Sequence, residues 1–213
     1  MFSFFVNFYK ALFFNFDMVI YEPAEDSFLL REFVLKYANG KVLDMGTGSG
    51  IQAEAALTKT NDVTAADINK EAIDFCTKKG IKALQSDLFE KINGKFDLII
   101  FNPPYLPLER DYFGVKLSEE DFNYVNDVSL VGGKKGWETI DRFLKQAKGF
   151  LNENGRILIS FSSLSGDVVS MFKKYRYDSE KLAEKRIFFE VLYVYLLSYS
   201  PSNSSKSFKE SSK

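Results

Sequence analysis

The sequence predicts an α/β fold in which a mostly parallel sheet carries helices on both faces. Short apolar runs alternate with helical patterns through the middle of the chain, as in folds built from strand–helix–strand units. The run at 96–102 (FDLIIFN) is almost wholly apolar, which is typical of a strand buried on both faces. Glycines and polar residues gather at the ends of the predicted strands, where ligands bind in such sheets.

Six strands are predicted from apolar or β-branched runs. They occupy residues 41–46, 62–68, 81–87, 96–102, 155–163 and 187–197. The last run (IFFEVLYVYLL) is long and rich in aromatic and β-branched residues, which favour strands.

Three helices are predicted around these strands from apolar positions at helical spacing. The first lies before strand 41–46 and is marked by Phe28, Leu29, Phe33 and Tyr37. The second is marked by Ala72, Ile73 and Cys76, with Asn69 as its expected N-cap. The third is marked by Trp137, Ile140, Phe143, Leu144, Ala147 and Leu151.

The two ends of the chain differ from the middle. Residues 1–17 form an aromatic extension, and positions 2–16 hold seven of the 22 phenylalanines. This segment is either the product of a start codon upstream of Met18 or an aromatic segment that packs on the domain or a partner. Residues 198–213 contain eight serines and are expected to be a disordered tail. One domain is therefore expected over 18–197.

Composition excludes several classes of function. The 28 basic and 29 acidic residues give a net charge of -1, which counts against a dedicated duplex-binding protein. The chain has no histidine and one cysteine, so we expect no metal site, no Ser-His-Asp triad and no intrachain disulfide. The apolar N-terminal stretch is too short and too polar to span a membrane. A reducing, cytoplasmic location fits the cysteine count.

The end of the first strand carries a nucleotide-type loop, Asp44 to Gly50 (DMGTGSG). Gly46 and Gly48 allow a tight turn and a close approach of a ligand to the backbone. Asp67 ends the second strand and can accept both ribose hydroxyls of an adenosine ligand. Asp44, directly before the glycines, would repel a pyrophosphate. The loop therefore favours S-adenosyl-L-methionine, which carries a sulfonium and an ammonium group, over a dinucleotide such as NAD.

The ends of the next two strands carry further candidate residues. Asp87 can accept from an adenine amino group, while the backbone amide of Leu88 can donate to the ring. After the fourth strand comes Asn102-Pro103-Pro104-Tyr105. The prolines fix the backbone and leave their carbonyls as acceptors, and the tyrosine offers a flat face. A planar NH2 group fits here, because its hydrogens can bond to the Asn102 side-chain oxygen and the Pro103 carbonyl. Catalysis would come from positioning and electrostatics, without a histidine base.

These segments resemble those of class I S-adenosylmethionine-dependent methyltransferases, which have a Rossmann-like, seven-stranded, mostly parallel sheet. More narrowly, the chain resembles the short HemK-type protein-glutamine N5-methyltransferases of archaea and eukaryotes. The matching segments are YEPAEDSFLL (21–30), VLDMGTGSG (42–50), ADIN (66–69), SDL (86–88), FNPPY (101–105) and GGKKGWETIDRFL (132–144).

The resemblance implies a function, a set of roles and a set of partners. The family methylates the glutamine of the Gly-Gly-Gln motif in translation release factors, and short members often work with a small zinc-binding activator subunit. Asn102, Pro103, Pro104 and Tyr105 would hold the glutamine amide. The methyl donor would be bound by Ser27, Asp44, Gly46, Gly48, Asp67, Asp87, Leu88 and Asn102.

Three alternatives remain open on the sequence. One is an adenine-N6 methyltransferase acting on RNA or DNA, since NPPY also serves base amino groups. A second is a methyltransferase acting on another protein, including on lysine. A third is a non-enzymatic subunit with the methyltransferase fold. Residues 106–130 hold six acids and two bases, and this net charge of -4 would attract a basic protein and repel nucleic acid.

Overall fold

The computed structural model describes residues 20–107, 111–112, 115–116, 130–187 and 190–199. In this part of the chain, seven strands form one sheet in the order β3 (Ala83–Gln85), β2 (Asp62–Asp67), β1 (Lys41–Met45), β4 (Phe96–Phe101), β7 (Leu151–Ser162), β9 (Glu190–Tyr199) and β8 (Tyr177–Ile187). Neighbours from β3 to β7 are parallel. Strand β9 is antiparallel to both β7 and β8. The predicted α/β class, with its seven-stranded and mostly parallel sheet, is confirmed.

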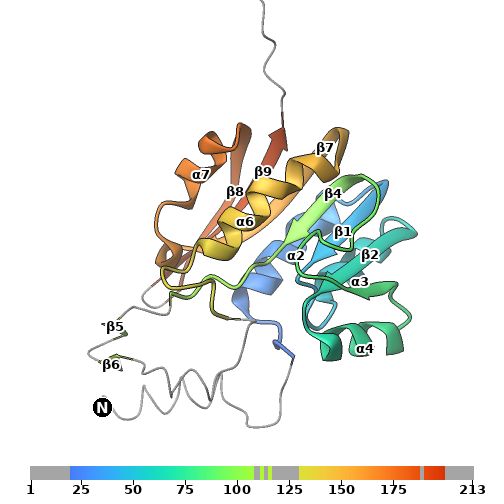
Figure 1. Ribbon diagram of the computed structural model, residues 1–213, viewed down its shortest axis with the longest axis horizontal. Coiled ribbons are helices and arrows are strands. Elements are labelled where there is room, and N and C mark those ends of the chain that lie inside the picture. The colour runs from blue at the N-terminus through green and yellow to red at the C-terminus, as the bar shows by residue number, and fades with distance from the viewer. Residues whose placement is uncertain (1–19, 108–110, 113–114, 117–129, 188–189, 200–213) are drawn as a thin grey trace, which may run out of the picture.

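Helices cover both faces of this sheet (Figure 1). One layer contains α2 (Glu25–Tyr37), α3 (Ile51–Leu57) and α4 (Lys70–Lys78). The other contains α6 (Glu138–Ala147) and α7 (Val168–Lys174). Strands β5 (Asp111–Tyr112) and β6 (Val115–Lys116) pair with each other in an antiparallel arrangement and form a separate two-stranded sheet.

Alternation along the central strands explains why both faces are covered. On β4, Ile99 and Phe101 join the core cluster under α6 and α7, whereas Leu98 and Ile100 join the cluster under α2 and α3. Ile99 and Ile100 are fully buried. Because side chains alternate between faces, a strand that is apolar at consecutive positions needs a helical layer on each side.

The predicted elements differ from the observed ones mainly at the C-terminal half. The six predicted strands are all present, but the third is shortened to Ala83–Gln85 and the fifth begins earlier, at Leu151. Leu151 was expected to continue the helix; instead α6 ends at Ala147, and a single 3-10 turn connects it to β7. Strand β8 and helices α3 and α7 were not predicted.

Two of the expected segments fall largely outside the described residues. The extension at 1–17 lies wholly outside them, as does most of the tail predicted at 198–213. Strand β9 nevertheless runs through Ser198 and Tyr199, two residues past the predicted domain boundary. The acidic segment 106–130 is described only at 106–107, 111–112, 115–116 and 130. No helix among the described residues is long and apolar enough to cross a bilayer.

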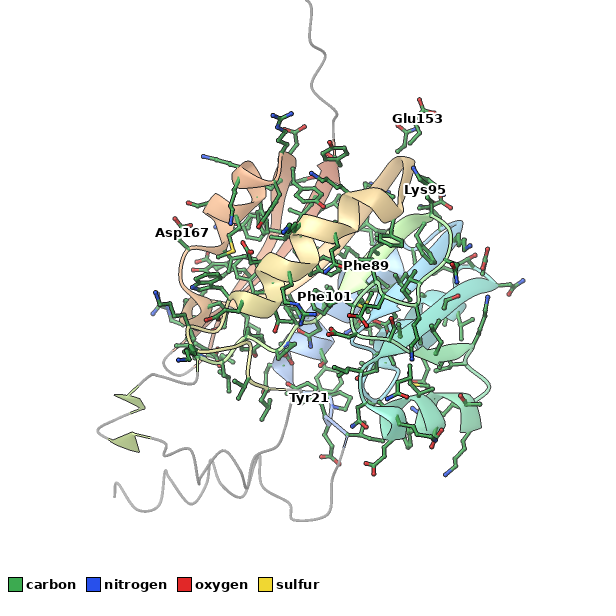
Figure 2. All side chains as sticks on the ribbon, viewed as in Figure 1. Tyr21, Phe89, Lys95, Phe101, Glu153 and Asp167 are labelled. Carbon is green, nitrogen blue, oxygen red and sulfur yellow. The ribbon has the colours of Figure 1, made fainter. Side chains whose placement is uncertain are left out.

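The parallel strands bring their carboxyl ends to one edge of the sheet. Figure 2 shows Tyr21 at the edge where β4 ends, whereas Lys95, which precedes β4, and Glu153, early in β7, lie at the opposite edge. Ligands bind at the carboxyl ends of parallel strands in open sheets of this kind. Apart from Ser27, which lies on α2, the predicted site residues lie at or just after the ends of β1, β2, β3 and β4, so they belong to this edge.

Candidate active site

The loop after β1 is an open turn built on three glycines with positive φ. Gly46, Gly48 and Gly50 have φ values of 63°, 51° and 84°. A Cβ at Gly50 would lie 2.9 Å from Ile81 Cδ1 and 3.0 Å from Cys76 Sγ, so the close packing and the positive φ together disfavour a side chain here. Among the residues that the structure describes, a Cβ at Gly48 would meet only Tyr21, at 3.8 Å, which leaves that side of the loop open to a ligand.

The buried Asp44 side chain stabilises this loop through hydrogen bonds. It is 1% exposed, and Oδ2 accepts from Thr47 Oγ1 at 2.6 Å and from the Ala53 amide at 3.0 Å. One carboxylate thus ties the glycine loop to the first turn of α3. Burial raises the pKa of Asp44 to about 7, although the two hydrogen bonds oppose this shift. A cation bound beside the carboxylate would favour its ionised form.

Asp67 sits at the end of β2, where the sequence places the ribose-binding acid. Its Oδ2 accepts from the Gly48 amide at 2.9 Å and its Oδ1 accepts from the Asn69 amide at 2.8 Å. Burial raises the pKa of Asp67, while these backbone hydrogen bonds lower it. Each oxygen keeps a lone pair for a further donor, so the acid can bridge the glycine loop and a pair of hydroxyls.

The segment after β3 is held in an unusual conformation. Leu88 has a φ of 46° and is buried, although left-handed backbone costs a non-glycine residue roughly 1–3 kcal/mol. Ser86 holds it, because Ser86 Oγ donates to the Leu88 carbonyl at 2.8 Å. The neighbouring Asp87 carboxylate is paired with Arg142 of α6, at 2.7 Å.

Asn102, at the end of β4, is clamped from two sides. Its Nδ2 donates to Asp26 Oδ2 at 3.1 Å and to Ser27 Oγ at 3.3 Å, both on α2. Its Oδ1 accepts from Ser160 Oγ of β7. The carboxamide therefore joins residues that are 58 to 76 positions away in sequence. An oriented amide of this kind can present its oxygen to an N–H of a bound acceptor.

Two tyrosines and a second carboxylate line the same region. Tyr21 donates to Asp26 Oδ1 at 2.9 Å, and Tyr105 donates to Asp26 Oδ2 at 3.3 Å. Burial, followed by the negative charge of Asp26 and also that of Glu190, raises the pKa of both hydroxyls. Both tyrosines therefore stay neutral donors. Glu190 itself is 8% exposed on β9 and accepts from Ser162 Oγ.

The Pro-Pro-Tyr backbone is braced by the glycines of the 132–144 segment. A Cβ at Gly132 would lie 2.6 Å from the Pro104 carbonyl, and one at Gly136 would lie 2.5 Å from the Tyr105 carbonyl. Ser165 Oγ also donates to the Tyr105 carbonyl, at 3.2 Å. These close approaches explain why the glycines accompany NPPY: only a residue without a side chain lets the two backbones meet.

The residues present fit a methyl donor that contains adenosine. The glycine loop is open above Gly48, and Asp67 offers acceptors at the expected ribose position. Gln52, which is 3% exposed on α3, donates from Nε2 to the Ser27 carbonyl at 2.8 Å. Its Oε1 has no hydrogen-bond partner among the described residues. A buried acceptor of this kind beside Ser27 suits an N–H of a ligand or a water molecule.

The structure thus gathers most of the predicted residues into two groups, while Asp87 and Leu88 lie in the segment after β3, where Asp87 pairs with Arg142. One group surrounds the glycine loop with Asp44 and Asp67, and the other unites Ser27, Asn102 and Tyr105. Sequence reasoning missed four residues of the second group, namely Tyr21, Asp26, Ser160 and Glu190. Two signals were available: Tyr21 and Asp26 lie in the matching segment 21–30, and Glu190 is an acid within an otherwise apolar aromatic run.

Comparison with known proteins agrees with this geometry. Residues 25–112 match the model of the methyltransferase small domain family. A chain from Methanocaldococcus jannaschii, named as a protein N5-glutamine methyltransferase, is 35% identical over 184 residues, which cover 82% of this chain and 89% of that one. The chain belongs to the protein N5-glutamine methyltransferase family. It is an S-adenosylmethionine-dependent methyltransferase, as the sequence predicts.

Two further relatives of this methyltransferase are informative. The release factor glutamine methyltransferase of Lactococcus lactis is 31% identical over 137 residues, which are 61% of this chain but only 50% of that protein. Mtq2 from E. cuniculi, solved with Trm112 as a complex that methylates the termination factor eRF1, has a TM-score of 0.66 and 25% identity, and the match covers 86% of this chain and 100% of that one. The matches cover nearly the whole of the M. jannaschii and E. cuniculi chains, but only half of the L. lactis protein.

Proposed function

We propose that this methyltransferase transfers a methyl group to the side-chain nitrogen of the glutamine in the Gly-Gly-Gln motif of a translation release factor. The main support is the Asn102 carboxamide after β4, which hydrogen bonds to Asp26 and Ser160 hold in one orientation beside the rigid Pro103 and Pro104. The names of the M. jannaschii and L. lactis relatives support the glutamine and the release factor as acceptors. A cytoplasmic location, where translation termination takes place, is part of this proposal.

The binding of the methyl donor follows from the first group of residues. S-adenosylmethionine, when bound, supplies an electrophilic methyl group. Asp67 would hold the ribose hydroxyls, and Gly46 and Gly48 would let the ligand approach the backbone. Asp87 and the Leu88 amide would hold the adenine, and Asp44 would provide negative charge behind the loop for the cationic end.

The acceptor amide would be bound by the second group of residues. Asn102 Oδ1 accepts one N–H of the glutamine NH2 group and the Pro103 carbonyl accepts the other, so the nitrogen lone pair is aimed away from both acceptors. Tyr105 flanks the amide plane. An amide nitrogen is a poor nucleophile, so the residues act by orientation and by stabilising the partial positive charge that develops on the N–H groups as the methyl is transferred. S-adenosylhomocysteine leaves as the S–CH3 bond breaks, and the nitrogen gives up one of its two protons to solvent.

A small zinc-binding activator subunit is a further part of the proposal. It is supported by the Mtq2–Trm112 complex of E. cuniculi. Because helices cover both faces of the sheet, we expect such a partner to bind apolar side chains that are exposed at an edge of the sheet. Ile68 and Phe75 are 48% and 39% exposed. The Ile68 carbonyl accepts from Gln85 of the edge strand β3, and α4, the helix that carries Phe75, packs against the same strand.

The experiment that tests the function uses labelled S-adenosylmethionine and three acceptors. These are the cognate release factor, the same factor with Gln→Ala in its Gly-Gly-Gln motif, and total RNA with DNA. Label on the first that is lost on the second would support glutamine methylation. Label on nucleic acid alone would support adenine methylation instead, and label retained on the Gln→Ala factor would indicate another protein residue, such as lysine. Each reaction is run with and without a candidate activator subunit.

A further inference from the structure

Asp26 lies at the centre of the acceptor site, although the motif comparison points to its neighbour Ser27. The carboxylate is 4% exposed. Its Oδ1 accepts from the Tyr21 hydroxyl at 2.9 Å and from the Ser27 amide and hydroxyl at 2.6 and 3.2 Å. Its Oδ2 accepts from Asn102 and from Tyr105. One side chain therefore contacts the catalytic asparagine, the flanking tyrosine and the start of α2.

The contact with Asn102 determines which way its carboxamide faces. The oxygen and the NH2 group of a carboxamide have nearly the same shape, so hydrogen-bond partners decide the orientation. An ionised carboxylate only accepts, so Asp26 requires Nδ2 on its side. Oδ1 then lies on the opposite side, where it accepts from Ser160 with one lone pair and keeps the second lone pair for an N–H of the acceptor. The Ser160 hydroxyl can donate or accept, and it follows whichever orientation Asp26 imposes.

We propose that Asp26 is a positioning residue that keeps Asn102 Oδ1 turned toward the acceptor nitrogen. This inference rests on the proposed function, because only an acceptor with N–H groups needs that oxygen. If the carboxamide turned by 180°, Nδ2 would face the acceptor's N–H group, donor against donor. Asp26 also fixes the Tyr105 hydroxyl, so the same carboxylate aligns both the amide and the ring that flanks the acceptor.

The substitution Asp26→Asn tests this role with almost no change of shape. The new Oδ1 can still accept from Tyr21 and the Ser27 amide, but the new Nδ2 then faces Nδ2 of Asn102. Turning Asn102 relieves this repulsion and removes the acceptor from the substrate side. We expect kcat to fall at least tenfold, while the S-adenosylmethionine Kd and the melting temperature change little. Glu25→Gln, the exposed preceding residue of α2, is the matched control and should keep wild-type kcat.

The double variant Asp26→Asn/Asn102→Asp separates positioning from general damage to the site. It exchanges donor and acceptor across the same contact, so an oxygen again faces the acceptor. We expect it to regain at least tenfold in kcat over Asp26→Asn. If Asp26 had only a structural role, the double variant should have a lower kcat than Asp26→Asn. A wild-type kcat in Asp26→Asn, or no recovery in a folded double variant that binds S-adenosylmethionine, would overturn the proposal.

A spectroscopic measurement distinguishes failure of this inference from failure of the proposed function. The side-chain amide resonance of Asn102, assigned by its loss in Asn102→Ala, is recorded by NMR without any acceptor. It should shift in Asp26→Asn and stay in place in Glu25→Gln. An unshifted resonance overturns the role of Asp26 whatever the substrate is. A shifted resonance, together with a wild-type enzyme that leaves the release factor unmethylated, would overturn the choice of substrate only.

Discussion

Arg142 Nη2 donates to Asp87 Oδ2 over 2.7 Å, and this pair joins α6 to the segment after β3. The contact turns the carboxylate proposed to bind adenine toward α6, against which Phe89 also packs through Phe143. Roughly half of the Arg142 side chain is exposed, so the pair adds little to folding stability, about 0–1 kcal/mol. Its main effect is on the orientation of Asp87.

The first prediction concerns this pair. Arg142→Met should weaken S-adenosylmethionine binding about threefold, in line with an exposed ion pair, because Asp87 loses the partner that holds its direction. The melting temperature should stay within a degree or two. Isothermal titration calorimetry measures the affinity. Lys145→Met, an exposed residue on the same helix, is the control. Equal losses in the two variants would point to a general charge effect.

The second prediction concerns Asn102. Asn102→Ala removes the oxygen proposed to accept from the glutamine amide and should lower kcat about 100- to 1000-fold, as for other oriented transition-state partners. The S-adenosylmethionine Kd should change far less, since most of the proposed donor contacts lie elsewhere. Single-turnover methyl transfer to the release factor measures the effect. Turnover within a factor of three of wild type would contradict the proposed role.

The third prediction concerns pH and Asp44. Its folded-state pKa of about 7 lies above the ordinary value of 3.8. Between these two pH values the folded chain binds a proton that the unfolded chain has lost, so this group lowers stability as pH rises from about 4 to 7. Asp44→Asn can still accept from Thr47 and Ala53 and should remove that slope. Urea unfolding at pH 4.5, 6 and 8 tests this, and identical slopes in the two proteins would contradict it.

A related effect is expected on ligand binding. A cationic ligand favours ionised Asp44, so S-adenosylmethionine affinity should rise with pH through about 7 and binding should release a proton below it. In Asp44→Asn the affinity should be lower and independent of pH in this range. Calorimetry in buffers of different ionisation enthalpy counts the released protons. No proton release by the wild type at pH 6 would contradict the prediction.

The fourth prediction uses two glycines with positive φ. Gly48 and Gly80 have φ values of 51° and 80°, and in both cases a Cβ meets no atom of the described residues closer than 3.8 Å. Alanine at either position should therefore cost a similar amount of stability, about 1–2 kcal/mol from the left-handed backbone alone. Only Gly48→Ala should weaken S-adenosylmethionine binding strongly, because its Cβ enters the ligand side of the loop. Equal affinities in the two variants would place the ligand elsewhere.

Much of the sheet could be predicted because its central strands carry local signals. Strand β4 is apolar on both faces, and Asn69 caps α4 by accepting from the Glu71 amide, as its sequence position indicates. Strand β8 lacked such a signal. It lies at the edge of the sheet, and most of its side chains are exposed and charged, so no apolar alternation marks it.

The acceptor site was only half predictable for a different physical reason. NPPY is a contiguous motif with restricted backbone, so Asn102 and Tyr105 stand out. Asp26 sits beside Glu25 in the first turn of α2, where acids are common because they favour the helix dipole. Its contact with Asn102 spans 76 positions, and only the folded chain reveals it.

The place of β9 in the sheet has a consequence for the order in which the protein can assemble on the ribosome. β9 lies between β7 and β8, although it is later in the sequence than both. Strands β1 to β4 can pair as soon as they emerge, whereas β8 must wait for β9 before it has a neighbour. Glu190, the second carboxylate near Tyr21 and Tyr105, arrives with that last strand. A nascent chain would therefore form its cofactor loop before Glu190 completes the surroundings of Tyr21 and Tyr105, and a ribosome stalled before residue 190 would display five paired strands with the edge of β7 exposed.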